Sequence, residues 1–180
     1  MEARLIELGP LPDGAVIWDV GAYKGDWSRD IKAAYPDAHL TLYEPVPEYH
    51  DALRASDKRC YGLSDRDGML DVTIAGDRSS TYEMGHQGTG KVLIMFKDVA
   101  GELMDRHLAV MKINVEGAEY PILERLLATD KVKQVGIFLI QFHTFIPNFG
   151  ERYLAIKQGL SKTHNLVWRT PFVWERWDRK

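Results

Sequence analysis

Hydrophobic and polar positions along this chain follow two periods, one typical of buried strands and one typical of amphipathic helices. Short apolar runs predict strands over residues 16–20, 40–43, 59–63, 109–114 and 134–142. Apolar residues spaced three and four apart predict helices over residues 26–35, 48–55 and 151–160, with a further helix opened by Pro121. The alternation of these segments predicts an α/β fold built on a mostly parallel sheet.

Two stretches depart from this alternation. Residues 69–75 and 91–96 look like a pair of strands, and Asp67-Gly68 before them suits a tight turn. We therefore expect a β-hairpin insertion near residues 68–97. Its tip, with Ser79, Ser80, Thr81 and His86, is either a plain loop or a lid that closes over a substrate. Residues 166–168 and 172–177 are expected to form a closing pair of strands.

Length and composition bound the class of protein. With 180 residues, 45% of them hydrophobic, the chain suits a single domain over residues 1–180. A net charge of −3 without a long basic run argues against a nucleic-acid partner, and no apolar stretch reaches the roughly 18 residues of a membrane span. The lone Cys60 cannot form an internal disulfide, and the first ten residues lack a signal-peptide core. We therefore expect a cytoplasmic protein.

The most informative segment is Asp19-Val20-Gly21-Ala22-Tyr23-Lys24-Gly25, between a predicted strand and a predicted helix. Glycines at such a turn let a ligand approach the backbone, and Glu44 at the end of the next strand is placed to accept two ribose hydroxyls. Val20 and Ala22 replace two glycines of a dinucleotide-binding turn, which disfavours a pyrophosphate site. Asp19 instead favours a cationic amine or sulfonium. The alternative is that Asp19 caps the helix and Glu44 is a solvated turn residue.

Four blocks in this order resemble the FkbM-type S-adenosylmethionine-dependent methyltransferases, which belong to the Rossmann-like methyltransferase class. The blocks are Asp19-Val20-Gly21-Ala22-x-x-Gly25, Tyr43-Glu44-Pro45, Leu63-Ser64-Asp65 and Lys112-Ile113-Asn114-Val115-Glu116-Gly117-Ala118-Glu119. The last block is the most specific, and the resemblance covers about residues 14–145. It implies a Rossmann-like, doubly wound sheet of seven strands, mostly parallel, with an antiparallel strand in the C-terminal hairpin. It also implies methylation of a hydroxyl, typically of a sugar or polyketide, with S-adenosyl-L-homocysteine as the second product.

The resemblance also implies where the cofactor S-adenosyl-L-methionine binds. The methionine part would lie along the first block, the ribose on the second and the adenine edge on the third, with the end of the fourth strand completing the site. The cofactor-binding residues expected on this basis are Asp19, Gly21, Ala22, Gly25, Glu44, Pro45, Leu63, Ser64, Asp65 and Asn114. We expect the carboxylates of Asp19, Glu44 and Asp65 to converge on one sulfonium nucleoside. For Asp65 the alternative is a turn aspartate beside Asp67-Gly68.

The candidate catalytic residues are His143, Lys112 and Glu116. His143 follows a predicted strand at its carboxyl end, where a neutral imidazole would take a proton from the acceptor hydroxyl; the alternative is a satisfied, partly buried histidine. A lysine within a buried strand must face a cleft or a carboxylate, so Lys112 either positions Glu116, polarises the substrate or forms a buried ion pair.

A catalytic metal is not expected, because this chain has Asn114 where the family pattern usually has Asp. A neutral amide is a weak ligand for a hard cation. Glu116 and Glu119 remain candidate oxygen ligands, and the alternative for both is a negative first turn that complements the helix dipole.

The predicted function is therefore O-methylation of a sugar or another small metabolite. The alternatives are a non-catalytic S-adenosylmethionine-binding protein of the same fold and an NAD-dependent oxidoreductase. The expected partner is a small-molecule or glycan acceptor, with no nucleic acid and no membrane. Either the acceptor is large and partly exposed, or a second copy of the chain, in a homodimer, completes the site. Trp168, Trp174 and Trp177 would either stack on a sugar or cover a sheet or dimer interface.

Overall fold

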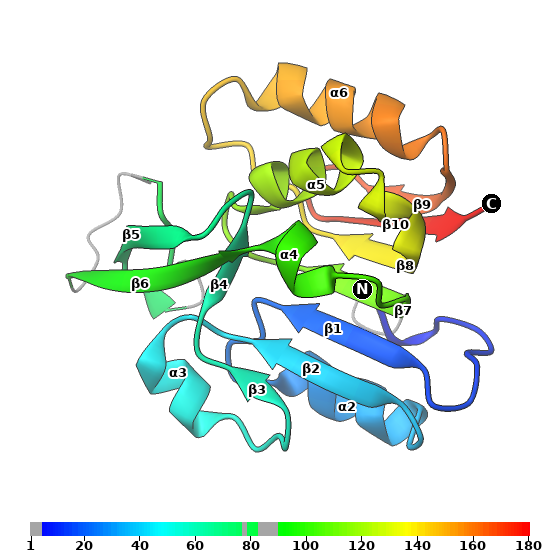
Figure 1. Ribbon diagram of the computed structural model, residues 1–180, viewed down its shortest axis with the longest axis horizontal. Helices are drawn as coiled ribbons and strands as arrows, with labels where there is room; N and C mark the ends of the chain where they lie inside the picture. The colour runs from blue at the N-terminus through cyan, green and yellow to red at the C-terminus, as the bar shows by residue number, and fades with distance from the viewer. Residues whose placement is uncertain (1–4, 77–78, 83–89) are drawn as a thin grey trace.

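The fold is built on a seven-stranded sheet with the order β3-β2-β1-β7-β8-β10-β9, in a computed structural model that describes residues 5–76, 79–82 and 90–180 (Figure 1). Its strands are β1 (Val16–Val20), β2 (His39–Tyr43), β3 (Lys58–Arg59), β7 (Leu108–Ile113), β8 (Val135–Ile140), β9 (His164–Thr170) and β10 (Trp174–Arg179). Neighbouring strands from β3 to β8 are parallel, whereas β10 runs antiparallel to both β8 and β9. The expected Rossmann-like sheet with a reversed strand in its C-terminal hairpin is confirmed.

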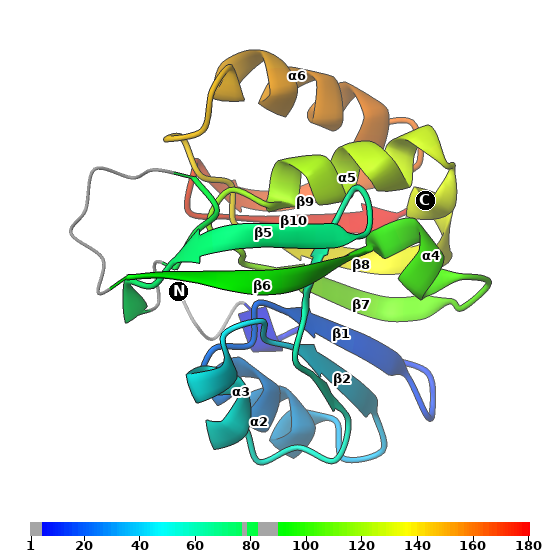
Figure 2. The ribbon, with the colours of Figure 1, turned by 60° about the vertical axis from the view of Figure 1, so that its left-hand side comes forward.

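Helices cover both faces of this sheet (Figures 1 and 2). On one face lie α2 (Asp26–Ala34) and α3 (Pro47–Ala52); on the other lie α4 (Val99–Leu103), α5 (Glu119–Ala128) and α6 (Phe149–Leu160), with a 3₁₀ turn at Lys131–Gln134. Successive residues of the central strands therefore enter different cores, as Val110 and Met111 do. This is why the central strands are almost continuously apolar in sequence. None of the helices in the described ranges has the length and apolarity that a bilayer span requires.

Helices α2 and α3 begin close to where the sequence predicts. Gly25 precedes α2 with a φ of 75°, and the helix ends before Pro36, while Pro47 occupies the first turn of α3. The predicted extension of α3 to residue 55 is wrong. Leu53 is extended, and the Lys58 ammonium donates hydrogen bonds of 2.9 and 3.1 Å to the carbonyls of His50 and Leu53. These bonds satisfy carbonyl groups that a continued helix would have used.

The single strand predicted over residues 59–63 is divided between two sheets. β3 pairs with β2, whereas β4 (Gly62–Ser64) pairs with β6 (Lys91–Asp98) in a second, three-stranded sheet. A Cβ at Gly62 would lie 2.2 Å from the ring of Phe96, so the two strands approach this closely only because residue 62 is glycine.

The second sheet contains the expected hairpin insertion. β5 (Gly68–Thr73) pairs antiparallel with β6, from Gly68 opposite Phe96 to Thr73 opposite Lys91. Figure 2 shows the hairpin next to α4 and α5. His86, which the sequence analysis placed at the hairpin tip, in either a plain loop or a lid, lies outside the described residues.

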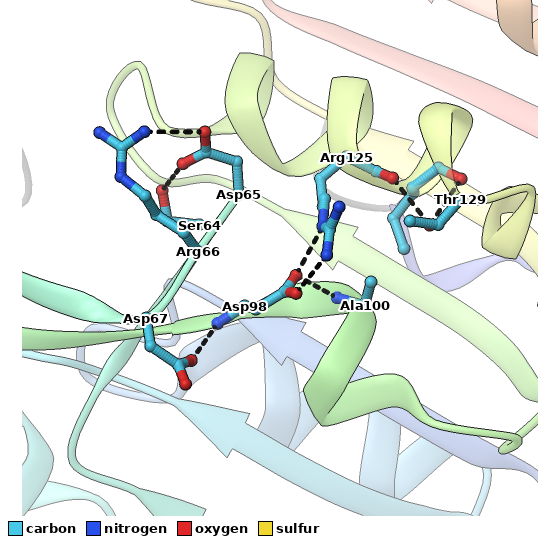
Figure 3. Close-up of polar contacts among 9 residues, drawn as sticks. Ser64, Asp65, Arg66, Asp67, Asp98, Ala100, Arg125 and Thr129 are labelled. Atoms are coloured by element: carbon cyan, nitrogen blue, oxygen red, sulfur yellow. Dashed lines mark hydrogen bonds and ion pairs between the residues drawn. The ribbon is translucent and has the colours of Figure 1, made fainter.

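Asp98 anchors this sheet to the rest of the molecule (Figure 3). Its side chain accepts a 2.9 Å hydrogen bond from the amide of Ala100 and so caps α4, a helix that the sequence did not predict. Arg125 of α5 donates to both carboxylate oxygens of Asp98, at 3.0 and 2.7 Å, and these bonds hold the pKa of Asp98 below its ordinary value. The hairpin is therefore fixed to α5 by a bidentate ion pair.

Candidate functional site

A cavity of about 720 Å³ lies beyond the carboxyl ends of β1, β2 and β7. Its lining includes Gly21, Glu44 and Asn114, which follow these three strands. Strand order reverses direction between β1 and β7, and open α/β sheets place ligands at such a reversal. We call this hollow the main cavity.

The turn after β1 needs glycine at its first position. Gly21 has a φ of +81°, and a Cβ there would lie 1.9 Å from the carbonyl oxygen of Asn114. The amides of Gly21 and Ala22 both donate to the carbonyl of Tyr43, at 3.0 Å each, which joins this turn to the end of β2. Gly25, by contrast, shapes the start of α2 and does not line the main cavity.

Glu44 is buried but still lines the main cavity. One carboxylate oxygen accepts a 2.8 Å hydrogen bond from the amide of Tyr23, and the other accepts a 2.9 Å bond from the amide of Val46. Burial raises the pKa of Glu44, although the two backbone donors oppose that shift. Each carboxylate oxygen has a second lone pair, so Glu44 retains capacity for ligand hydroxyls.

Asp19 does not face the cavity, contrary to expectation. Its side chain is fully buried, where one oxygen accepts a 2.8 Å hydrogen bond from the ammonium of Lys112 and the other a 2.5 Å bond from the hydroxyl of Ser28. The Lys112 ammonium also donates to the carbonyl of Gly21 at 2.8 Å, and Lys112 lines the main cavity. Of the alternatives for Lys112, the structure shows the buried ion pair, with Asp19 rather than Glu116 as its partner.

The expected convergence of three carboxylates is also wrong for Asp65. Leu63 lines the main cavity, but Ser64 and Asp65 line a separate hollow of about 260 Å³, the second cavity. Asp65 accepts a 3.2 Å hydrogen bond from the hydroxyl of Ser64 and lies 3.5 Å from Arg66 (Figure 3). The reason is that β4 leaves the main sheet to pair with β6 and carries these residues toward α5.

Apolar walls on the same side of the main cavity were missed by the sequence reasoning. Val46, Val72 and Phe96 are buried together against Tyr49, and all four line the cavity beside Leu63. Val72 and Phe96 belong to the hairpin insertion. The docking of the hairpin on the main sheet places them at the cavity, and this contact is not visible in the sequence.

Asn114 presents a buried acceptor at the main cavity. Its side-chain Oδ1 is buried and has no hydrogen-bond partner among the described residues. Leaving such an atom unpaired costs about 1–3 kcal/mol unless a ligand donates to it. This is the feature expected of a residue that completes its hydrogen bonds with a bound molecule.

His143 lies between two carboxylates. Nδ1 lies 3.1 Å from Oε1 of Glu119, and Nε2 lies 3.0 Å from Oε1 of Glu116, at ion-pair distance but not aligned for a hydrogen bond. Burial alone would lower the pKa of this imidazole, but the two carboxylates outweigh burial and raise it to about 9. His143 is therefore protonated at neutral pH, and it is not among the residues that line the main cavity. The neutral imidazole base expected from the sequence is not what the structure presents.

Glu116 and Glu119, at the start of α5, have different surroundings. Glu119 is fully buried and accepts 2.8 Å hydrogen bonds from the amides of Gly117 and His143. Glu116 lines the main cavity and has a φ of +50°, a strained value that often marks functional positions. Within the described part of the chain, no three His, Cys, Asp or Glu side chains are grouped to hold a metal ion.

The three C-terminal tryptophans have different surroundings. Trp177 is buried in the core beneath α5 and α6, and Trp168 packs against the core on the α2 face, so these two cover the sheet. Trp174 lines the main cavity with Trp27 and Leu5. Only Trp174 among the three is placed to contact a ligand there.

The strand order, the glycine turn after β1 and the acid after β2 define a Rossmann-like α/β protein with a cavity at its strand ends. A family description, the methyltransferase FkbM domain, matches residues 19–166, and the chain belongs to this methyltransferase family. A search of curated proteins finds no significant match.

Solved structures support the fold. A methyltransferase FkbM from Methylobacillus flagellatus superimposes with a TM-score of 0.62 at 13% identity, over 95% of this chain and 45% of that protein. A precorrin-6y C5,15-methyltransferase from Geobacter metallireducens superimposes with a TM-score of 0.53 at 14% identity, over 99% of this chain and 87% of that protein. An O-methyltransferase family protein from Burkholderia thailandensis superimposes with a TM-score of 0.51 at 10% identity, over 99% of this chain and 55% of that protein. The chain thus spans less than half the length of the Methylobacillus protein.

Proposed function

We propose that this chain is an S-adenosylmethionine-dependent O-methyltransferase whose main cavity binds the methyl donor, and whose acceptor is a hydroxyl of a sugar or another small metabolite. The observation that carries the proposal is Glu44, a buried carboxylate with acceptor capacity at the end of β2, in a cavity of about 720 Å³. Membership in the FkbM methyltransferase family supports it.

The residues present fit the donor. Glu44 would accept the ribose hydroxyls, and the apolar walls formed by Val46, Tyr49, Leu63, Val72 and Phe96 would enclose the base. The methionine part would lie beside Gly21, where Asn114 Oδ1 would accept from the amino group and Lys112 would face the carboxylate. When bound, S-adenosylmethionine supplies a methyl group already activated by its sulfonium.

The chain's own contribution to the reaction is to hold the acceptor in line and to receive its proton. Glu116 is the carboxylate that lines the main cavity at the start of α5, and His143 is held protonated beside it. We therefore assign the proton-accepting role to Glu116. His143 is a positioning residue that fixes the Glu116 carboxylate.

Calorimetry with S-adenosylhomocysteine tests the donor site. Wild type should bind, and Glu44→Ala should bind at least about tenfold more weakly, because hydrogen bonds to a charged group contribute about 1.5–3 kcal/mol. Glu48→Ala is the matched control, since Glu48 is exposed in the first turn of α3 and does not line the cavity. Thermal unfolding establishes that each variant is folded. No heat from the wild type at high micromolar ligand would reject the proposal.

The role of Glu116 is tested once mass spectrometry of a hydroxyl-compound library has identified an acceptor. Glu116→Gln should lower kcat by about 100-fold, the lower end of general-base effects, without changing affinity for S-adenosylhomocysteine. His143→Gln should lower kcat less and alter its pH profile above about pH 8, where His143 begins to lose its proton. A larger effect at His143 than at Glu116 would reverse the assignment.

A further inference from the structure

The second cavity lies beside the main cavity and has both polar and apolar walls. Its volume is about 260 Å³, and its lining comes from residues 64–68, from the hairpin strands, from α5 and from α6. Thr81, Phe96 and Ala118 line both cavities. The two hollows are therefore neighbours that share a wall.

Residues 80–82 fix this wall onto the turn that carries Glu116. The hydroxyl of Ser80 donates to the carbonyl of Glu116 at 2.6 Å and accepts from the amide of Tyr82 at 3.0 Å. A Cβ at Gly117 would lie 2.7 Å from the Tyr82 ring, so the ring packs directly on that glycine. Tyr82 lines the second cavity, which places this cavity next to the proposed proton acceptor.

The lining of the second cavity contains three carboxylates and two guanidinium groups, from Asp65, Asp67, Glu124, Arg66 and Arg152. Arg152 donates through Nε and Nη2 to the two oxygens of Glu124, at 2.7 Å each, so this guanidinium is already neutralised. Arg66 lies 3.5 Å from Asp65, and its side chain is 79% exposed. Asp67 uses one carboxylate oxygen to accept from the amide of Asp98, at 2.8 Å.

The lining therefore offers carboxylate oxygens from Asp65 and Asp67, the hydroxyl of Ser64, and the rings of Tyr82 and Phe96. Carboxylates accept hydrogen bonds from hydroxyl and ammonium groups, and aromatic rings pack on the carbon faces of a sugar. A phosphate or carboxylate group would meet a lining in which carboxylates outnumber guanidinium groups, which disfavours it.

We propose that the second cavity binds the non-reacting part of the methyl acceptor, and that this part is a neutral or amino-bearing polyhydroxylated group, such as a hexose or hexosamine unit, rather than a phosphorylated one. The inference rests on the proposed function, because the main cavity must hold the donor for a neighbouring site to present the acceptor. It adds the place and the charge preference of the acceptor.

Amide NMR titrations of the labelled protein, saturated with S-adenosylhomocysteine, test this inference. The probes are D-glucose, D-glucosamine and D-glucose 6-phosphate, each to about 50 mM, well above the millimolar range of weak complexes. Glucose or glucosamine should shift the amides of Asp65, Gly68 and Tyr82, and the phosphate should bind at least about tenfold more weakly than the better of these two.

Asp65→Asn removes the charge but keeps the shape, so it should reduce the preference for glucosamine over the phosphate by about tenfold. Asp71→Asn, on an exposed position of β5 outside the second cavity, should leave the preference unchanged. Neither variant should change affinity for S-adenosylhomocysteine.

Two outcomes overturn the inference. One is that neither glucose nor glucosamine shifts the amides at the second cavity; the other is that glucose 6-phosphate binds more tightly than both. Either result, together with normal binding of S-adenosylhomocysteine, rejects this inference alone. Absence of S-adenosylhomocysteine binding would instead reject the proposed function.

Discussion

At Gly21 a single residue determines whether β1, β2 and β7 can meet around the main cavity. Its φ of +81° and the 1.9 Å approach of the Asn114 carbonyl to a built Cβ leave no room for a side chain. Gly21→Ala should therefore lower the melting temperature by several degrees or prevent folding, and should abolish binding of S-adenosylhomocysteine. Gly150→Ala is the control, because a Cβ at that position in α6 meets nothing within 4 Å. Equal melting temperatures for the two variants would contradict this reading.

The buried pair of Lys112 and Asp19 predicts an asymmetric response to mutation. Among the described residues, Lys112→Met leaves the buried Asp19 carboxylate with Ser28 as its one side-chain partner, which should cost about 3–5 kcal/mol of unfolding free energy. Adding Asp19→Asn should recover part of that loss, since the uncompensated charge is removed. Urea unfolding measures both effects. A loss below about 1 kcal/mol in the single variant would mean that the pair is not buried as described.

His143 predicts a pH dependence of stability. Its pKa rises from an ordinary 6.5 to about 9 on folding, so the folded state binds the proton more tightly than the unfolded state. This stabilisation is complete below about pH 6.5 and is lost as the pH rises toward 9; at about 1.4 kcal/mol per pKa unit it amounts to about 3 kcal/mol. The unfolding free energy should therefore fall between pH 6.5 and 9, and His143→Gln should flatten that slope. An unchanged slope in the variant would show that other groups cause it.

Among elements, the β5–β6 hairpin is joined to α5 by a bidentate ion pair. Arg125 holds both oxygens of Asp98, and two inward-facing residues of the hairpin, Val72 and Phe96, form part of the main cavity wall. Arg125→Met should raise hydrogen exchange in β6 and α4 and weaken binding of S-adenosylhomocysteine a few-fold. Lys133→Met, which breaks an exposed ion pair with Asp130, is the matched control. Unchanged exchange in the Arg125 variant would show that packing alone holds the hairpin.

Most elements of the main sheet could be predicted because each buried strand carries its signal within a few residues. The division of residues 59–63 could not, because it depends on contact between Gly62 and Phe96, far apart in the chain. Helix α4 was missed for a similar reason: its cap, Asp98, is identified by the structure around it.

In the candidate site, too, features fixed by neighbouring residues could be predicted, and features fixed by distant contacts could not. Gly21 and Glu44 could be placed because they directly follow strands whose carboxyl ends share an edge. Asp65 could not, since the strand before it joins a different sheet. The protonation of His143 could not be predicted from the sequence either, because it depends on two carboxylates from another segment.

At the scale of the whole molecule, we propose that the main cavity binds the methyl donor and that the second cavity binds part of the acceptor. The main cavity opens over β1, β2 and β7, and the second lies between residues 64–68 and helices α5 and α6. The start of α5, with Ala118 in both linings and Glu116 in the main cavity, stands between them. In the proposed reaction, donor and acceptor would approach this point from opposite sides.

A crystal structure of the chain with S-adenosylhomocysteine would test the donor site. We expect the ribose hydroxyls on the Glu44 carboxylate, the base between Tyr49 and Phe96, and a donor from the ligand on Asn114 Oδ1. A ligand bound elsewhere, with no contact to Glu44, would contradict this expectation.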